Sequence, residues 1–360
     1  MPNAIQQIFQ DHSPAYLVRY GNQMPSNHKK VIRAICNCGT GAFGQHSFSC
    51  DGCGQMHYAE SSCGNRHCPT CQGSKSDEWL NKQLAKVLPV NYFMITFTVP
   101  KELRRLIRSN QKVGYTALFK AASGALKKLA KDPRFVGCET AGFTGILHTW
   151  TRQLEYHPHV HFIVPGGGLS KDGGEWKSSA VNFYIHAKPL GQIFRAKFIE
   201  YLNAEGLKVP PCVWKPDWVI DARHVGNGKR ALKYLAQYVF RVAVAPSRIL
   251  QVTETEVLFK YQPSGVKVWK TMRLTIFEFM RRYLQHVLPH GFTKVRHYGF
   301  LAPNCKTSLQ RIRELICALY EILTDLVLEK KPAHRKPWTC KSCGGLIRWR
   351  EFIPCPRGSG

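Results

Sequence analysis

The sequence predicts an α+β protein that is preceded by a cysteine-rich metal-binding segment, and three observations support this prediction. Residues 91–99 form an unbroken apolar and β-branched run, which is typical of a strand buried on both faces of a sheet. Several longer segments repeat apolar residues at the helical spacing of three and four. Seven cysteines and three histidines gather between Cys36 and Cys71. Strands, helices and a separate metal-binding region are therefore expected in one chain.

The composition favours a polyanion as the partner. Lys and Arg outnumber Asp and Glu by 51 to 23, which gives a formal charge of +28 over 360 residues. An aromatic content of 11% allows base stacking in addition to phosphate contacts. A solvated basic surface is the alternative explanation, so the charge gains weight only beside a site that acts on nucleic acid.

The sequence predicts neither a membrane span nor a secretory signal. Its apolar runs are shorter than the roughly 18 to 20 residues that cross a bilayer. The first residues lack a basic region followed by an apolar run. We therefore expect a cytoplasmic protein, in which the 14 cysteines serve as metal ligands or thiols rather than as disulfides.

Residues 1–35 have a helical and basic pattern, and the cysteine-rich segment follows them. Its two Cys-x-x-Cys pairs have nearly the spacing of a zinc ribbon, and Gly52 and Gly54 supply tight turns beside the first pair. We predict two structural zinc ions, with free buried thiols as the alternative, while the pairing of the ligands is a guess. The first predicted set is Cys50, Cys53, Cys68 and Cys71, and the second is Cys38, His46, Cys63 and His67.

Helical patterns flank the apolar strand at residues 91–99. An amphipathic helix over about residues 77–88 precedes it and ends at Pro89. A basic helix follows Pro100, and a second long helix covers about residues 113–130. This order predicts a sheet with helices beside it.

A histidine pair marks the next predicted strand, over residues 156–165. Pro158 blocks a helix there, and the β-branched and aromatic run after it predicts a strand. Side chains two apart on a strand share a face, so His159 and His161 point the same way. Neutral imidazoles bind metals without adding charge, so this pair predicts half of a metal site.

A third ligand is available on the preceding strand-like run, residues 145–150. If this run pairs as an antiparallel neighbour, His148 comes within reach of the pair. His157 competes with His148 for the third position. Packed or surface histidines are the alternative to a metal site. After the second strand, residues 166–168 are three glycines that predict the start of a loop.

Residues 228–241 predict an amphipathic helix with two tyrosines one turn apart. Two phenols flanked by arginines form a candidate nucleophile pair, because arginine binds phosphate oxygens as a bidentate donor. A tyrosine pair packed on a basic surface helix is the alternative. The predicted polar face comprises Arg230, Tyr234, Gln237, Tyr238 and Arg241, and the apolar face comprises Ala231, Leu235, Val239 and Val242.

The remaining sequence predicts a hairpin, two helices and a small tail. The hairpin strands are residues 256–261 and 266–270. One helix begins at about residue 275, and a second covers about residues 308–330. The tail is an incomplete candidate zinc site, because a complete second cysteine pair is missing. Its possible ligands are His334, Cys340, Cys343 and Cys355.

Taken together, these motifs resemble the two-tyrosine HUH rolling-circle transposases of bacterial insertion sequences, which are related to the eukaryotic Helitrons. The resemblance runs from about His12 to Pro303. It is carried by Cys38 and His46, Cys50-Asp51-Gly52-Cys53-Gly54, Ser62-Cys63-Gly64-Asn65-Arg66-His67-Cys68-Pro69-Thr70-Cys71, Ile95-Thr96-Phe97-Thr98-Val99-Pro100, Leu147-His148-Thr149-Trp150, His157-Pro158-His159-Val160-His161, Val164-Pro165-Gly166-Gly167-Gly168, Tyr234-x-x-x-Tyr238-Val239-x-Arg241 and Arg296-His297-Tyr298-Gly299.

The resemblance implies an HUH-endonuclease antiparallel sheet with the histidine pair at its centre, flanking helices and a tyrosine helix across the site. It also implies a catalytic Mg or Mn ion on His148, His159 and His161. The expected domains are the N-terminal helices and zinc-binding domain (1–90), the nuclease domain with the tyrosine helix (91–250), a C-terminal transposase region (251–335) and the cysteine-containing tail (336–360).

The implied activity is transposition by cleavage and rejoining of single-stranded DNA. Tyr234 or Tyr238 attacks the strand and leaves a 5′-phosphotyrosine and a free 3′-hydroxyl, while Arg230 and Arg241 bind DNA. The partners are transposon ends, target DNA and host replication or helicase factors, since the sequence has no helicase P-loop. The expected location is the bacterial nucleoid. A plasmid replication initiator or relaxase, and a non-catalytic zinc-ribbon regulator, remain alternatives.

Overall fold

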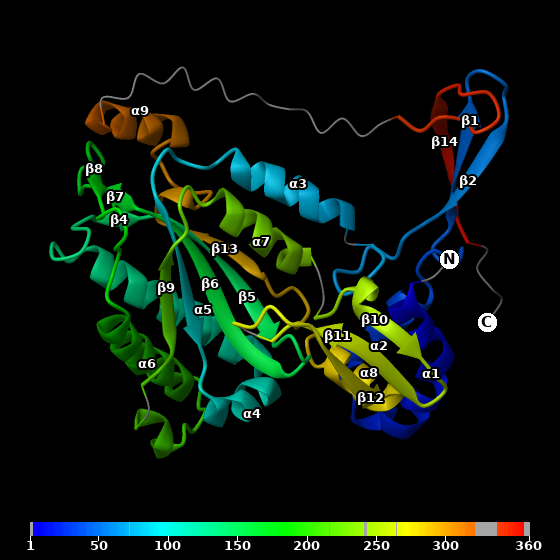
Figure 1. Cartoon of the computed structure of the whole chain (residues 1–360), viewed down its shortest axis with the longest axis horizontal. Coiled ribbons are helices and arrows are strands. Elements are labelled where there is room, and N and C mark those ends of the chain that lie inside the picture. The colour runs from blue at the N-terminus through cyan, green and yellow to red at the C-terminus, as the bar shows by residue number, and fades with distance from the viewer. Residues whose placement is uncertain are drawn as a thin grey trace. The chain divides into compact units, whose positions relative to one another are not determined.

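The computed structural model describes residues 3–71, 73–215, 217–240, 243–263, 265–320 and 337–355. The chain divides into two units of non-consecutive segments, whose elements Figure 1 traces. The four consecutive domains expected from the sequence differ from this division, because later segments join units that earlier segments begin. Unit 1 comprises Met1–Glu78, Phe240–Val287 and Val327–Gly360, and unit 2 comprises Trp79–Val239 and Leu288–Leu326.

Unit 2 is built on a five-stranded antiparallel sheet with the order β13-β5-β6-β3-β9. The histidine-bearing strand β6 lies at its centre, and the apolar strand β3 is an interior strand, as the sequence predicts. The predicted α+β class with an antiparallel sheet and flanking helices is confirmed. The strands are β3 (Tyr92–Thr98), β5 (Phe143–Trp150), β6 (Tyr156–Pro165), β9 (Ile220–His224) and β13 (Val295–Tyr298).

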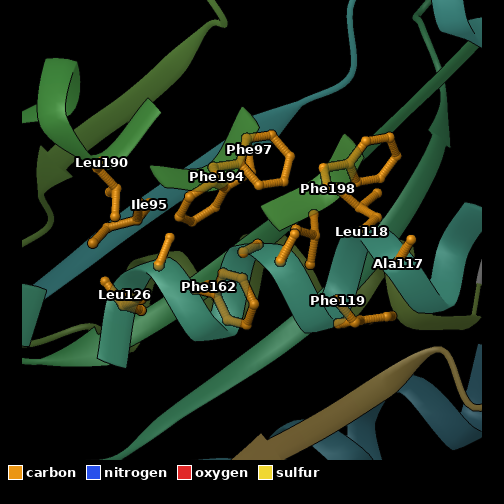
Figure 2. Close-up of a cluster of buried hydrophobic side chains, with 14 of the residues drawn as sticks. Ile95, Phe97, Ala117, Leu118, Phe119, Leu126, Phe162, Leu190, Phe194 and Phe198 are labelled. Carbon is orange, nitrogen blue, oxygen red and sulfur yellow. The ribbon is translucent and has the colours of Figure 1, made fainter. Parts of the chain in front are cut away.

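One face of this sheet carries the main apolar core of unit 2. Ile95 and Phe97 of β3 and Phe162 of β6 point to it, because alternate strand residues share a face. They pack on the long helices α5 and α6, whose Leu118 and Phe194 lie among them in Figure 2. Each such burial contributes roughly 1.5–3 kcal/mol, so this face fixes the sheet. The helices that follow β3 and β8 are α4 (Lys101–Ser109), α5 (Gln111–Ala130) and α6 (Ala187–Ala204).

The opposite face carries both the histidines and helix α7 (Lys229–Phe240). Ile146 of β5 and Ile163 of β6 lie two residues from His148 and His161, and therefore share their face. The apolar side of α7 packs on these isoleucines, and Figure 1 shows α7 over the sheet. Its buried residues in this cluster are Ala231, Leu232 and Leu235, and Trp79 and Leu80 of α3 (Gly73–Leu84) pack beside them.

A small second sheet in unit 2 has the order β4-β7-β8. The predicted loop at residues 166–168 is wrong, because Gly167 and Gly168 belong to β7 (Gly167–Leu169). A Cβ on Gly168 would lie 2.5 Å from the Cys138 sulfur, so close packing explains the glycine. The predicted helix at 308–330 is observed as α9 (Leu309–Tyr320), and its remainder lies outside the described residues. The other strands are β4 (Thr140–Ala141) and β8 (Trp176–Ser178).

Unit 1 combines helices with two three-stranded sheets. The predicted N-terminal helices are confirmed as α1 (Ala4–Tyr20) and α2 (Ser26–Cys36). The hairpin is also present, but its second strand lies later than predicted and runs directly into the cap of α8 at Thr275. The sheets are β14-β1-β2, made of β1 (Gln45–Cys50), β2 (Met56–Glu60) and β14 (Ile347–Ile353), and β10-β11-β12, made of β10 (Ile249–Val252), β11 (Glu256–Tyr261) and β12 (Lys270–Thr275), followed by α8 (Ile276–Leu284).

No helix among the described residues is both long and apolar enough to span a membrane.

Candidate active site and metal centres

Three histidines of unit 2 meet on one face of the central sheet. The antiparallel register places His148 of β5 directly opposite His159 of β6, and His161 follows two residues later. One ring nitrogen from each imidazole lies within 4.8 Å of the others. His148 and His161 are buried, and His159 is half-buried. The structure therefore brings together the three residues that the sequence nominates as ligands.

Two of these imidazoles are held by hydrogen bonds on their Nδ1 atoms. Nδ1 of His161 lies 2.8 Å from Oγ1 of Thr96, which is its partner across the β3–β6 pair. Nδ1 of His159 lies 2.7 Å from the backbone carbonyl oxygen of His157. Such contacts select the tautomer and leave Nε2 to face a metal. The sequence analysis did not single out Thr96. Pairing β3 with β6 in the antiparallel register would have placed Thr96 opposite His161, on the same face of the sheet.

His157 does not join the three-histidine group. It contributes its carbonyl oxygen to the orientation of His159, and its own Nδ1 is buried with no hydrogen-bond partner among the described residues. Burial lowers the pKa of His157 to about 4. Between the two candidates for the third position, the geometry favours His148.

Burial keeps the three imidazoles neutral. It lowers the pKa of His161 to about 4 and holds those of His148 and His159 well below the usual value. The charge of each neighbouring imidazolium would add to this effect for His148 and His159. Three neutral nitrogen donors fit a catalytic divalent ion, although imidazole by itself favours softer metals than Mg or Mn.

Cationic side chains flank the histidines. Nε of Arg104 in α4 is buried and has no hydrogen-bond partner among the described residues. Its positive charge adds to burial in lowering the pKa of His159. Trp150 stacks on His148 with ring centroids 5.3 Å apart, and Nζ of Lys294 lies 4.8 Å from the Trp150 ring. The surroundings of the site therefore suit an anion.

The tyrosine helix is α7. Tyr234 is 41% exposed and Arg230 is exposed, while Ala231 and Leu235 are buried, as the predicted helix faces require. The backbone of Tyr238 lies in α7, one turn after Tyr234. The side chains of Gln237 and Tyr238, and all of Arg241 and Val242, lie outside what the structure describes.

A four-cysteine group in unit 1 comprises Cys38, Cys63, Cys68 and Cys71. The Cys71 sulfur lies 3.3 Å from that of Cys38 and 3.4 Å from that of Cys63. The contact between the Cys63 and Cys68 sulfurs lowers the pKa of Cys68 to about 5 and raises the pKa of Cys63. Four thiolates at this separation need a cation, and a tetrahedral zinc with bonds of about 2.3 Å has sulfur–sulfur edges of roughly 3.8 Å. The group fits zinc.

The second four-cysteine group corrects the predicted pairing. Cys50 and Cys53 lie with Cys340 and Cys343, not with the pair at Cys68 and Cys71. The predicted pairing is wrong because β14 returns to pair with β1, a contact that local spacing does not reveal.

Neither predicted histidine belongs to a four-sulfur group. His46 sits on the face of β1 and accepts a hydrogen bond from Nε1 of Trp349 at 3.2 Å. His67 is buried, and its carbonyl oxygen accepts from the Tyr283 hydroxyl at 2.8 Å. Cys355 is exposed, and His334 lies outside the described residues.

Comparisons with known proteins identify two family models and one solved structure. Residues 142–308 match a family model described as "Putative transposase", and residues 8–99 match a model described as "Transposase zinc-binding domain". The solved structure "Conjugative Relaxase TrwC in complex with mutant OriT Dna" aligns with 62% of this chain and 72% of its own chain, at 12% identity and a TM-score of 0.25, a likeness too low to support a shared fold.

Two relatives match most of the chain. "Putative transposase y4qJ" of Sinorhizobium fredii is 34% identical over 86% of this chain and 83% of its own length. "Transposase for insertion sequence element IS801" of Pseudomonas savastanoi pv. phaseolicola is 26% identical over 94% of this chain and 87% of its own length. The chain therefore belongs to the two-tyrosine rolling-circle transposases of bacterial insertion sequences, with an N-terminal transposase zinc-binding domain.

Proposed function

We propose that this transposase cleaves and rejoins single-stranded DNA, at the ends of its element and at the target, through a 5′-phosphotyrosine. The observation that supports this best is that α7, the helix of Tyr234 and Tyr238, packs on the sheet face that carries the three histidines. A nucleophile and a metal site on a common face can act on the same phosphate.

The chain's own residues prepare the site. His148, His159 and His161 hold Mg or Mn, which when bound polarises the scissile phosphate as a Lewis acid. Thr96 and the His157 carbonyl keep two of the rings oriented, and burial keeps them unprotonated. Arg104, Arg230 and Arg241 bind phosphate oxygens of the strand, as guanidinium groups do in bidentate pairs.

The covalent step exchanges one phosphodiester for another. The phenol oxygen of a tyrosine forms a bond to phosphorus and loses its proton to solvent. The bond to the 3′ oxygen breaks, and that oxygen leaves with the electron pair and takes up a proton. Because the phosphotyrosine conserves the bond energy, a 3′-hydroxyl can reverse the step without a nucleotide cofactor. The second tyrosine serves a second strand.

Two further parts of the proposal concern support for this reaction. Cys38, Cys63, Cys68 and Cys71 hold a structural zinc in the zinc-binding domain. Strand unwinding comes from host replication or helicase factors at the nucleoid, because the sequence contains no P-loop.

A denaturing gel with labelled single-stranded DNA tests the nucleophiles. In Mn or Mg the unchanged protein should form a covalent adduct with DNA that carries its own element's ends. Tyr234→Phe and Tyr238→Phe should each weaken or redirect the adduct, and the double variant should abolish it. Adduct formation by the double variant would show that α7 is not the nucleophile helix.

Histidine variants test the metal site in the same gel. His159→Ala and His161→Ala should abolish the adduct, and so should His148→Ala. His157→Ala is the matched control and should retain it, since His157 acts through its backbone carbonyl. A protein that never forms an adduct on its element's ends would favour a zinc-ribbon regulator, and adducts only on plasmid origins would favour a replication initiator or relaxase.

A further inference from the structure

We propose that Cys50, Cys53, Cys340 and Cys343 bind a structural zinc ion that fastens the segment 340–353 to the N-terminal zinc-binding domain. The family model for that domain matches residues 8–99 and so includes only half of these ligands. We call this group the zinc clasp. It does not depend on the DNA-cleaving activity proposed above.

The four sulfurs have the arrangement of a tetrahedral site. The Cys50 and Cys343 sulfurs lie 3.3 Å apart, and the Cys53 and Cys340 sulfurs lie 3.8 Å apart. These separations approach the edges of roughly 3.8 Å expected around zinc, and they are far longer than the bond of about 2.05 Å in a disulfide. All four ligand atoms lie within 4.8 Å of one another.

The two halves of the zinc clasp are the same local structure. The backbone N–H groups of Gly52 and Cys53 donate to the Cys50 sulfur, and those of Ser342 and Cys343 donate to the Cys340 sulfur. Each turn closes with an N–H to carbonyl bond of 2.9 Å, from Gly54 to Cys50 and from Gly344 to Cys340. Gly54 and Gly344 have φ of +73° and +74°, a conformation that favours glycine. Two such knuckles supply two thiolates each, as in a four-cysteine zinc site.

The two knuckles also pack directly on each other. A Cβ on Gly345 would lie 2.9 Å from the Cys50 sulfur, and a Cβ on Gly52 would lie 3.2 Å from the Cys343 sulfur. The N–H of Asp51 donates to the carbonyl of Leu346 at 2.9 Å, and the β1–β14 ladder continues from there. The backbones therefore approach closely enough for one ion to bind both.

Besides its pairing with β1, β14 has little apolar burial to hold it in place. Six of its seven residues are exposed, among them Trp349 at 58% and Phe352 at 47%. A strand with so little burial gains little hydrophobic free energy. Binding of a structural zinc ion is coupled to folding of the segment that supplies its ligands, so zinc at Cys340 and Cys343 would order this strand.

Zinc content of the full chain tests the clasp. After desalting without chelator, the Cys340→Ser/Cys343→Ser variant should contain one zinc per chain fewer than the unchanged protein. Cys355→Ser is the matched control, because this exposed thiol lies on the same tail outside the group, and it should lose none. Equal zinc content in the double variant and the unchanged protein would overturn the proposal.

Alkylation of the unchanged protein provides a test that needs no variant. With zinc bound, Cys355 should react while Cys340 and Cys343 are protected, and a chelator should expose both, as read by mass spectrometry. Rapid alkylation of Cys340 and Cys343 in the zinc-loaded protein would also overturn the clasp. Both readouts are independent of DNA cleavage, so failure of the clasp and failure of the proposed activity are distinguishable.

Discussion

At the scale of single residues, the proposed metal site depends on hydrogen bonds to the far side of the histidine rings. Thr96 holds the ring of His161 by its Nδ1 atom, and a backbone carbonyl does the same for His159. A ligand that must find its own orientation binds more weakly, because the metal then orders the ring. Thr96 is therefore a positioning residue for the site.

Thr96→Val should weaken Mn²⁺ binding by about 10–100-fold, because it removes the hydrogen bond at nearly constant volume. Calorimetric titration of the full chain measures the affinity. Thr98→Val is the control, because Thr98 lies opposite His159 in the β3–β6 pair, yet Nδ1 of His159 is held by the His157 carbonyl, so the affinity should stay unchanged. Equal affinities for the two variants would remove Thr96 from the site.

Residue patterns predicted the grouping of the three histidines better than the grouping of the cysteines. His159 and His161 needed only the alternation of one strand, and His148 needed only pairing between consecutive strands. Cys343 lies 293 positions after Cys50, and Cys340 lies 287 positions after Cys53, so no local rule could identify these partners. Sequence reasoning succeeded where the contacts are local and failed where they are not.

At the scale of elements, β13 ends in a turn that requires glycine. Gly299 has φ of +57°, and a Cβ there would lie 1.8 Å from the carbonyl oxygen of Ala141. A side-chain movement can relieve neither the positive φ nor this close contact, because both involve backbone atoms. The Arg296-His297-Tyr298-Gly299 motif thus has a steric reason at its last position.

Gly299→Ala should lower the free energy of unfolding by about 2–4 kcal/mol, the sum of backbone strain and overpacking. Gly206→Ala is the matched control, with φ of +74° and open space around its Cβ, and should cost only about 1 kcal/mol. Urea unfolding of both variants measures the difference. Equal losses would mean that the backbone near Ala141 yields to the added methyl.

Element boundaries were less predictable than element types. The apolar run at 91–99 predicted β3 because its burial on both faces leaves no alternative pattern. The three glycines at 166–168 predicted a loop, but β7 uses two of them where Trp176 and Cys138 pack too closely for side chains. Tertiary packing overrode local preference there.

At the scale of the whole molecule, the charge of +28 should dominate DNA binding. Affinity for single-stranded DNA should fall with salt at a logarithmic slope of about −0.7 per phosphate contacted, because each contact releases counterions. Titrations from 50 to 200 mM salt measure this slope, and Arg230→Gln should reduce its magnitude by about 0.7. If the affinity did not change with salt concentration, the positive charge would not serve to bind DNA phosphates.

The pairing of β1 with β14 also constrains the order of events during synthesis. Cys53 and Cys340 are separated by 287 positions, so at about 5–20 residues per second the ribosome needs roughly 15–60 s to make the second knuckle after the first. During that interval the first knuckle carries two thiols without their partners. The three-stranded sheet of β1 and β2 is therefore completed late in synthesis, because its third strand, β14, exists only after translation has passed residue 353.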